Sequence, residues 1–455
     1  MAAAALPNWV MVDRFVYRRD DDKSFREDKR TSATSTTSTG APFRVSFILA
    51  EPPTPSRLYV WWPEGPKRRL VCHLVAAHRD LVLLRLDSIA LESTEEHPEP
   101  FQVMILHDYF VYIPDAPPSQ PKLKRLPACT EEDSLFMGKP DLRPFEPHSV
   151  GLLRRGEEEF AVAYLTVSRS KRSVQAQLWV LRSSVSTRPS SSDDDVGDKW
   201  EIKRLPIQHL PDEYNDLYYW LSHEVVPFKD SLCWINYYRG ILFCDGVFGD
   251  SPKVSYSRLP LDSFPRHPSR HTRKELYRGL CVTEDGHRLQ FVDVARDDGA
   301  GIGPMAPSST GFTITSWNAR RLGNGATCWS TDATVKALEL WDQNTPASLP
   351  RQVMMLPLLT MDKPDVAHLI LYEWQDVVDK ASLVTIDLTA KRVVGKVVPY
   401  INGEEDLSTD DADMVNLKPK NFAPFLPTEF SKFLNPGRLY NKAHSTVLRK
   451  GGSHG

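Results

Sequence analysis

Proline is the feature of this sequence that most restricts its fold. The chain has 36 prolines in 455 residues. Each proline lacks an amide donor and its ring clashes with the preceding helical turn, so this frequency forbids long helices. The 11 tryptophans and 15 tyrosines favour the half-buried surfaces of pleated sheets. The sequence therefore predicts an all-β fold of many short strands with few short helices.

Short runs rich in valine, leucine and aromatic residues follow this prediction along the chain. Each is bounded by proline, glycine or charge, which is typical of strands. They lie at residues 9–17, 43–49, 57–62, 70–76, 81–86, 101–113, 161–167, 176–182, 366–372, 383–388 and 393–398. Residues 232–247 and 280–294 read as hairpins. The first hairpin would turn near Arg239 and Gly240, where glycine permits the positive φ of a tight turn.

One short pattern recurs at the ends of predicted strands. A basic residue, leucine and proline follow one another at residues 124–127, 203–206 and 257–260. Strand groups that recur in this way are typical of propeller blades, whose radial packing buries both faces of each sheet. We therefore expect a β-propeller-like array of short antiparallel sheets, with about six blades. If Leu-Pro merely ends strands in a proline-rich chain, other architectures such as two sandwiches stay open.

The same scan predicts how the chain is divided. Residues 1–8 are expected to be a flexible N-terminus, and residues 9–400 the propeller-like domain. Two polar insertions, 26–42 and 183–199, are predicted to be disordered loops because they lack the apolar residues needed to bury them. Residues 401–455 are expected to form a C-terminal extension with a short helix at 428–434 and a disordered tail. Residues 212–224 fit a helix and a strand equally well.

The net charge and the lack of recognised targeting signals indicate which kind of partner and which cellular compartment to expect. The net charge is −3, with 56 basic and 59 acidic residues, so nucleic acid is not the expected partner. No run approaches the ~18 apolar residues that cross a bilayer, and no signal peptide is recognised. The six scattered cysteines and the absence of an Asn-x-Ser/Thr acceptor do not fit a secreted protein. We expect a cytoplasmic or nuclear protein.

The sequence contains few motifs that are typical of catalytic or metal-binding sites. His73 and His78, which follow Cys72, differ by an odd number and point to opposite faces of an extended strand, so no metal site is predicted. The Gly-x-Ser-x-Gly turn of serine hydrolases is absent. Cys233 or Cys244 beside His223 is a conceivable nucleophile, but packing in the core is favoured. No cofactor and no catalytic residue are predicted.

Several motifs in order resemble a known family. Residues 234–262 read WINYYRGILFCDGVFGDSPKVSYSRLPLD, and further matches lie at residues 7–15, 361–366, 385–388 and 398–400. Together they resemble the plant domain-of-unknown-function 1618 family, which is expanded in grasses. The named domain would cover roughly residues 234–372. The resemblance implies a propeller-like fold and carries over no catalytic residue, since the family's activity is not established.

Binding residues are predicted only at the first hairpin. Tyr237, Tyr238 and Arg239 would lie at its tip, with Trp234 buried, and aromatic residues with arginine often anchor protein interfaces. The leading hypothesis is thus a non-enzymatic scaffold that binds another protein. The alternative is a hydrolase-type enzyme whose carboxylates come together in an axial pocket from separate blades. A nucleus-associated protein that contacts nucleic acid through a local basic patch is a third hypothesis.

Overall fold

The computed structural model describes residues 6–67, 71–92, 102–115, 119–136, 139–142, 144–169, 173–185, 198–264, 273–283, 286–322, 326–343, 349–374, 378–401 and 425–435. Strands dominate these residues and the helices are short, which confirms the all-β prediction. The chain divides into two compact units. Unit 1 comprises residues 1–144 and 426–455, and unit 2 comprises residues 145–425. Of the helices in the described ranges, none has the length and hydrophobicity that spanning a membrane requires.

Unit 1 contains two larger sheets and a hairpin. The first sheet has the order β2-β3-β4-β1-β28, and the second has the order β5-β6-β7-β8. The strands are β1 (Val10–Arg19), β2 (Ala33–Thr36), β3 (Pro42–Ile48), β4 (Ser56–Trp61), β5 (Cys72–His78), β6 (Leu81–Glu92), β7 (Gln102–Ile113), β8 (Lys122–Arg125), β9 (Thr130–Phe136), β10 (Lys139–Leu142) and β28 (Phe425–Thr428). β9 and β10 form the hairpin. β1 is buried along almost its whole length, which explains its imperfect alternation of apolar and polar residues.

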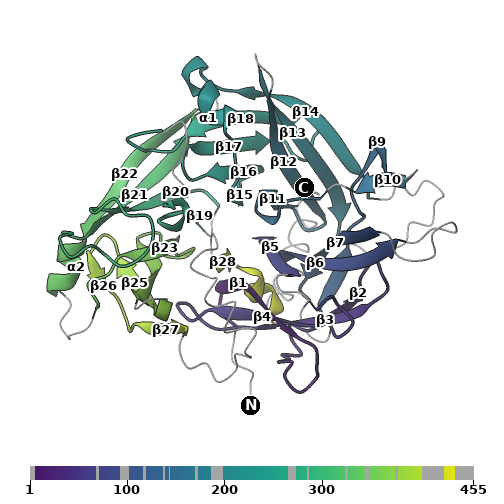
Figure 1. Cartoon of the computed structure of the whole chain (residues 1–455), viewed down its shortest axis with the longest axis horizontal. Helices are drawn as coiled ribbons and strands as arrows, with labels where there is room; N and C mark the ends of the chain where they lie inside the picture. The colour runs from purple at the N-terminus through teal and green to yellow at the C-terminus, as the bar shows by residue number, and fades with distance from the viewer. Residues whose placement is uncertain are drawn as a thin grey trace, which may run out of the picture. The chain divides into compact units, whose positions relative to one another are not determined.

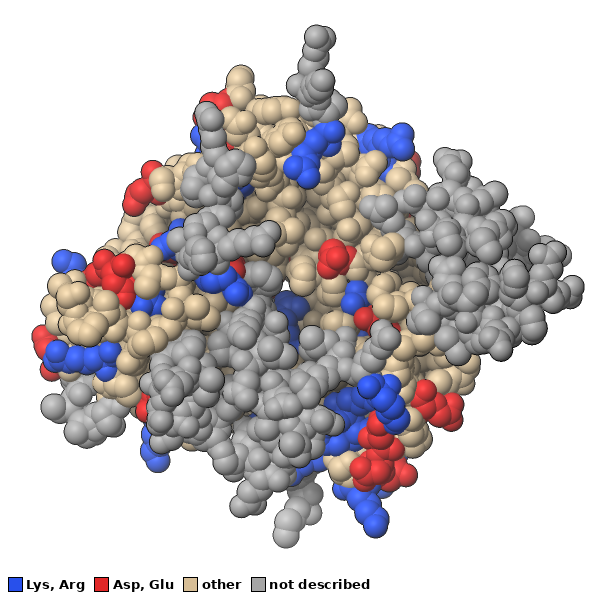
Figure 2. All heavy atoms as spheres, viewed as in Figure 1, with Lys and Arg blue, Asp and Glu red and all other residues tan. Residues whose placement is uncertain are grey.

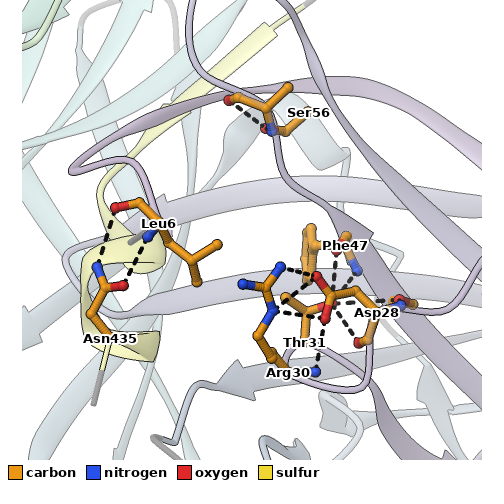
Figure 3. A network of polar contacts seen from close by, with 9 residues as sticks. Leu6, Asp28, Arg30, Thr31, Phe47, Ser56 and Asn435 are labelled. Carbon is orange, nitrogen blue, oxygen red and sulfur yellow. Dashed lines mark hydrogen bonds and ion pairs between the residues drawn. The ribbon is translucent and has the colours of Figure 1, made fainter. Parts of the chain in front are cut away.

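The C-terminal residues complete the first sheet of unit 1. β28 pairs with β1, and the 3-10 helix η5 (Phe430–Leu434) follows it. As Figure 3 shows, the Asn435 side chain accepts a hydrogen bond from the Leu6 amide at 2.9 Å and donates one to the Leu6 carbonyl at 3.2 Å. The short C-terminal helix was predicted correctly. Residues 6–8, expected to be flexible, are instead held by these contacts, and residues 1–5 lie outside the described ranges.

The prediction of a disordered loop at residues 26–42 is wrong. This segment contains β2, which pairs with β3. Thr31 fixes the start of the segment: its hydroxyl donates to the Phe47 carbonyl at 2.8 Å and accepts from the Phe47 amide at 2.9 Å (Figure 3). Threonine-rich composition resembles low complexity, but here the hydroxyl groups hydrogen-bond to the backbone. Of the second predicted insertion, residues 186–197 lie outside the described ranges.

Unit 2 contains four successive groups of strands. They are β11 (Val150–Arg155), β12 (Glu159–Arg169), β13 (Val174–Ser184) and β14 (Trp200–Gln208); β15 (Glu224–Phe228), β16 (Ser231–Asn236), β17 (Gly240–Asp245) and β18 (Lys253–Arg258); β19 (Arg278–Val282), β20 (Leu289–Arg296), β21 (Phe312–Arg321) and β22 (Thr327–Lys336); and β23 (Met354–Leu359), β24 (Val366–Trp374), β25 (Val378–Asp387), β26 (Arg392–Val393) and β27 (Val398–Ile401). The helices are η1 (Pro147–Ser149), η2 (Pro211–Glu213), α1 (Tyr214–Tyr218), η3 (Lys274–Leu276) and α2 (Ala337–Gln343). Within each group the neighbouring strands are antiparallel, and a short parallel contact between β14 and β18 joins the first two groups.

These groups stack as propeller blades do. The first strand of each packs on the first strand of the next, so β11 contacts β15, β15 contacts β19 and β19 contacts β23 (Figure 1). Glycine permits this approach: a Cβ on Gly151 of β11 would lie 2.6 Å from the Val225 side chain, and one on Gly279 of β19 would lie 2.1 Å from the Pro357 carbonyl. The packing covers both faces of the two middle sheets, those of β15 and β19, and confirms the propeller-like array.

The basic-Leu-Pro pattern ends a strand in two of its three copies. The copies at residues 124–127 and 257–260 overlap the ends of β8 and β18. The prediction is wrong for the copy at residues 203–206, which lies inside β14. Each of these strands is the fourth of its group.

Candidate interaction site

The predicted binding residues lie at a turn but are not exposed. Residues 237–239 join β16 to β17, in which Asn236 pairs with Gly240. The exposed fractions of Tyr237, Tyr238 and Arg239 are 2%, 9% and 1%. The hairpin is as predicted, but the accessible tip is not, because other segments cover the turn. These three side chains therefore organise neighbouring parts of unit 2 and do not present themselves to a partner.

Position 240 has room for glycine only. Its φ is not among the positive values, so the expected left-handed conformation is wrong for this residue. A Cβ built on Gly240 would lie 2.3 Å from the carbonyl oxygen of Ser257 on the adjacent β18. The backbone of β17 thus approaches β18 too closely for any side chain at this position.

The two tyrosines hold carboxylates on either side of the turn. The Tyr237 hydroxyl donates to Glu224 Oε2 at 2.7 Å, and the Tyr238 hydroxyl donates to Glu275. The Tyr238 oxygen also accepts a hydrogen bond from the Lys274 amide at 3.0 Å. Glu224 begins β15, and Glu275 belongs to η3 before β19. The turn thereby connects the start of one sheet to the start of the next.

The cysteines near this turn are packing residues. Cys233 and Cys244 belong to the hydrophobic cores of unit 2. Burial raises the pKa of the Cys244 thiol to about 12 and also raises the pKa of Cys233. Since the thiolate is the nucleophile, neither side chain is activated at neutral pH. The interpretation of both cysteines as core residues is confirmed.

His223 gives the turn a pH-dependent contact. Its Nδ1 accepts a hydrogen bond from the Tyr237 amide at 3.1 Å, and burial lowers the pKa of this imidazole from 6.5 to about 4. Between these values the unfolded chain binds a proton that the folded chain does not. The contribution to stability is therefore complete above pH 6.5 and is lost as the pH falls towards 4.

We predict that a His223→Asn variant loses less stability than the wild type between pH 6.5 and pH 4. The asparagine oxygen can replace Nδ1 as the acceptor but does not titrate. The difference should be roughly 3 kcal/mol, at about 1.4 kcal/mol per pKa unit. Urea denaturation at several pH values measures it. Identical pH dependence in both proteins would show that His223 is not buried as a neutral group.

A buried ion-pair network extends from Arg239 to the segment that covers the turn. Arg239 Nη1 lies 3.1 Å from Asp216 Oδ1, and these side chains are 1% and 5% exposed. Arg258 Nε donates to Asp216 Oδ2 at 2.8 Å, and its Nη1 donates to Asp212 Oδ2 at 2.6 Å. The Tyr256 hydroxyl lies 3.4 Å from Asp216 Oδ2. Asp216 belongs to α1, so this network fixes α1 onto the β16–β17 turn and β18.

The covering segment, residues 210–221, presents large apolar side chains to solvent. It contains η2 and α1, and Leu217 anchors it in the core with no exposed surface. Leu210, Tyr219 and Leu221 are 62%, 36% and 62% exposed. The sequence of residues 212–224 fitted a helix and a strand equally well. In the structure these residues begin as a helix and end in β15. The covering segment is called the 210–221 segment below.

Aromatic and cationic contacts fix the exposed end of the 210–221 segment. Arg169, at the end of β12, donates from Nη1 to the Tyr218 carbonyl at 2.8 Å, and its guanidinium lies over the Tyr218 ring at 5.3 Å. Tyr218 and Tyr219 meet edge to face at 5.0 Å. Arg239 lies beneath, 5.8 Å from the Tyr219 ring centroid. The exposed side chains therefore project from a backbone that is already ordered.

The carboxylates around the turn are engaged by protein donors. Asp216, Glu224 and Glu275 are 3%, 8% and 5% exposed. Each accepts a hydrogen bond from arginine or tyrosine. A glycoside substrate needs carboxylates that it can reach, and here it would have to displace these donors. The arrangement suits a structural network better than acid–base chemistry.

The histidine pattern in unit 1 is also structural. His73 Nε2 lies 3.2 Å from Asp87 Oδ2, and His107 Nδ1 lies 2.7 Å from Asp87 Oδ1. Arg85 also pairs with this carboxylate, at 2.9 Å. Within the described ranges, no group of three or more histidine, cysteine, aspartate or glutamate residues is placed to hold a metal ion. A cation would also compete with Arg85 for Asp87.

Sequence reasoning found the turn and missed the exposed surface. Tyr237, Tyr238 and Arg239 were recognised by composition, and the structure brings them together with His223. It does not bring them to the surface, and it exposes Leu210 and Leu221 instead. Local composition offered one signal for the segment: tyrosine, tryptophan and leucine lie close together at residues 217–221 without a clear period of 2.

A family model matches part of the chain. Residues 234–368 match the model of a family described as protein of unknown function, DUF1618. The match begins at Trp234 on β16 and ends at His368 on β24. The predicted resemblance, at residues 234–372, is confirmed over this range. The 210–221 segment precedes the matched residues. No curated protein matches the chain.

Solved structures give only weak similarity. A polysaccharide lyase of family PL25, an ulvan lyase bound to a GlcA–Rha3S saccharide, shares 10% identity, with a TM-score of 0.29 and coverage of 86% of this chain and 85% of that one. The α-L-arabinofuranosidase Arb93A from Fusarium graminearum, in complex with an iminosugar inhibitor, also shares 10% identity, with a TM-score of 0.23 and coverage of 84% of each chain. Similarity at these scores transfers no activity to this protein.

Proposed function

We propose that this chain, whose residues 234–368 match the model of the DUF1618 family of unknown function, is a non-catalytic protein-interaction module. The observation that supports the proposal is the 210–221 segment. Three large apolar side chains there are exposed on a backbone that buried ion pairs hold in place. Ordered apolar anchors of this kind bind with little loss of conformational entropy.

The residue types of the segment suit a protein partner. Tyrosine, tryptophan and arginine are the residues that contribute most to protein interfaces. Trp220 lies in the same segment, half-buried against Tyr256 at 6.0 Å, with its indole N–H donating to Ser222 at 3.1 Å. Leu210, before η2, and Leu221, after α1, are each 62% exposed. Several large apolar side chains exposed within one short segment favour a binding site.

The distribution of charge also favours a protein over a polyanion. On the face shown in Figure 2, basic and acidic side chains lie interspersed among the other residues. Nucleic-acid binding proteins instead concentrate lysine and arginine in one patch. We further propose an intracellular location, because the structure describes all six cysteines and none of them forms a disulfide. Reduced thiols are typical of the cytosol and nucleus.

Affinity purification with matched variants tests the proposed function. The full chain and a Leu221→Ser variant are used as baits, with Leu338→Ser as the control, because Leu338 on α2 is 49% exposed. We expect the wild type and the control to recover the same protein reproducibly and Leu221→Ser to recover at least tenfold less. If no protein is enriched by the wild type over an empty matrix, the interaction module is the wrong function.

A further inference from the structure

The surface around the 210–221 segment also indicates which chemistry a partner carries. Resting on the proposed function, we propose that the segment binds an acidic peptide stretch of another protein that bears leucine or aromatic anchors. Two features carry this inference: the exposed apolar side chains of the segment, and an exposed arginine beside it, Arg169, that has no carboxylate partner among the described residues.

The leucine or aromatic anchors of the partner are inferred from Leu210, Tyr219 and Leu221. Leu210 precedes η2, and its amide donates to Glu213 Oε2 at 2.7 Å, which fixes the start of the segment. Tyr219 and Leu221 follow α1 and are exposed, whereas Leu217 is buried in the core. A partner gains free energy here by removing these side chains from water, about 25 cal/mol per Å² of apolar surface. Leucine or aromatic residues on the partner would fill the contact.

The acidic character of the partner is inferred from Arg169. This residue is exposed, and it contacts the carbonyl and the ring of Tyr218. Within the described ranges no carboxylate pairs with it. Its guanidinium is therefore held in a fixed position with further N–H groups directed to solvent. A carboxylate can accept two of these N–H groups in parallel, which makes arginine the preferred partner of acidic groups.

The neighbouring charges do not cancel this preference. Asp212 is 66% exposed but is already paired with Arg258, which also pairs with buried Asp216. Arg204, on the β14 strand that leads into the segment, is exposed and likewise has no carboxylate partner in the described part of the chain. Arg204 lies opposite Gln177 and Arg169 lies opposite Val174, and these two positions of β13 face opposite sides of the sheet. The charge beside the segment is therefore that of Arg169. A partner with lysine or arginine would be repelled there.

Selection from a random 12-residue peptide library tests the inference. The full chain is the bait, and the enriched peptides are synthesised and titrated by fluorescence anisotropy. We expect enriched peptides to combine aspartate or glutamate with leucine, phenylalanine or tryptophan. Leu221→Ser and Arg169→Glu should each weaken binding at least tenfold. Leu338→Ser and Arg320→Glu, which change exposed residues elsewhere in unit 2, should change it less than twofold.

The other outcomes separate the two proposals. If peptides bind equally well to Leu221→Ser and Arg169→Glu, the segment is not the site and the inference fails, while the interaction module stands. Enrichment of basic peptides would overturn the acidic partner alone. If no peptide is enriched, the inference fails, and the purification experiment decides the module separately. A dimer of the free chain that Leu221→Ser dissociates, seen by sedimentation, would replace the peptide with a second copy.

Discussion

An Asp216→Ala variant is expected to lose about 3–5 kcal/mol of unfolding free energy, because it removes one member of a buried ion pair and leaves a buried charge uncompensated. Arg239 is 1% exposed and pairs with Asp216 at 3.1 Å. Arg258 and Tyr256 also donate to this carboxylate. Urea denaturation monitored by tryptophan fluorescence measures the loss in unit 2. The variant should also bind a partner more weakly, since α1 loses its fixed position.

The matched control for this variant is Asp212→Ala. Asp212 pairs with the same Arg258, at 2.6 Å, but its side chain is 66% exposed. Pairs accessible to solvent contribute little, so we expect a much smaller loss of stability than in Asp216→Ala. Equal losses in the two variants would contradict the role of Asp216 as the buried anchor of the 210–221 segment.

A Phe430→Ala variant is expected to destabilise unit 1 by about 3–5 kcal/mol, the usual cost of removing a buried phenylalanine side chain. Phe430 has no exposed surface and belongs to the core of unit 1. Its ring lies 4.8 Å from Phe47 and 5.8 Å from Tyr112, measured between centroids. The loss would show that the C-terminal residues are part of this core. Thermal unfolding and urea denaturation measure it.

Phe433→Ala is the control for Phe430. It lies in the same helix η5 but is only half-buried, so we expect a clearly smaller loss of stability. A Phe430→Ala protein as stable as the wild type would contradict the assignment of residues 425–435 to the sheet of β1.

Local patterns were sufficient to predict many of the strands, but not, among others, β2, β21, β22 or β23, and not all of the strand partners. The hairpin at residues 232–247 was predicted because its apolar run, its turn and its return strand are contiguous. The pairing of β28 with β1 was not predicted, since these strands lie at opposite ends of the chain and nothing in the Phe425–Thr428 sequence encodes a partner. The strand in residues 26–42 was missed for a related reason. Its order depends on Thr31 contacting Phe47, which composition does not reveal.

The candidate site shows the same limit. Sequence indicated that Tyr237, Tyr238 and Arg239 form a notable turn, because aromatic residues and arginine stand together beside Gly240. It could not indicate that α1 and η3 cover this turn, because Asp216 and Glu275 lie 23 and 37 residues away from the groups they bind. Burial of the turn and exposure of Leu221 are therefore consequences of tertiary contacts. We therefore propose that the binding surface is the 210–221 segment, which the turn supports, and not the turn itself.

The most direct test of the interaction module is site-specific photo-crosslinking in the cells that make this protein. A benzophenone amino acid replaces Leu221 in one protein and Leu338 in another. We predict a discrete cross-linked species, containing one other protein, from position 221 and none from position 338. Cross-linking that is equal at both positions, or absent at 221, would contradict the claim that the 210–221 segment is a binding surface.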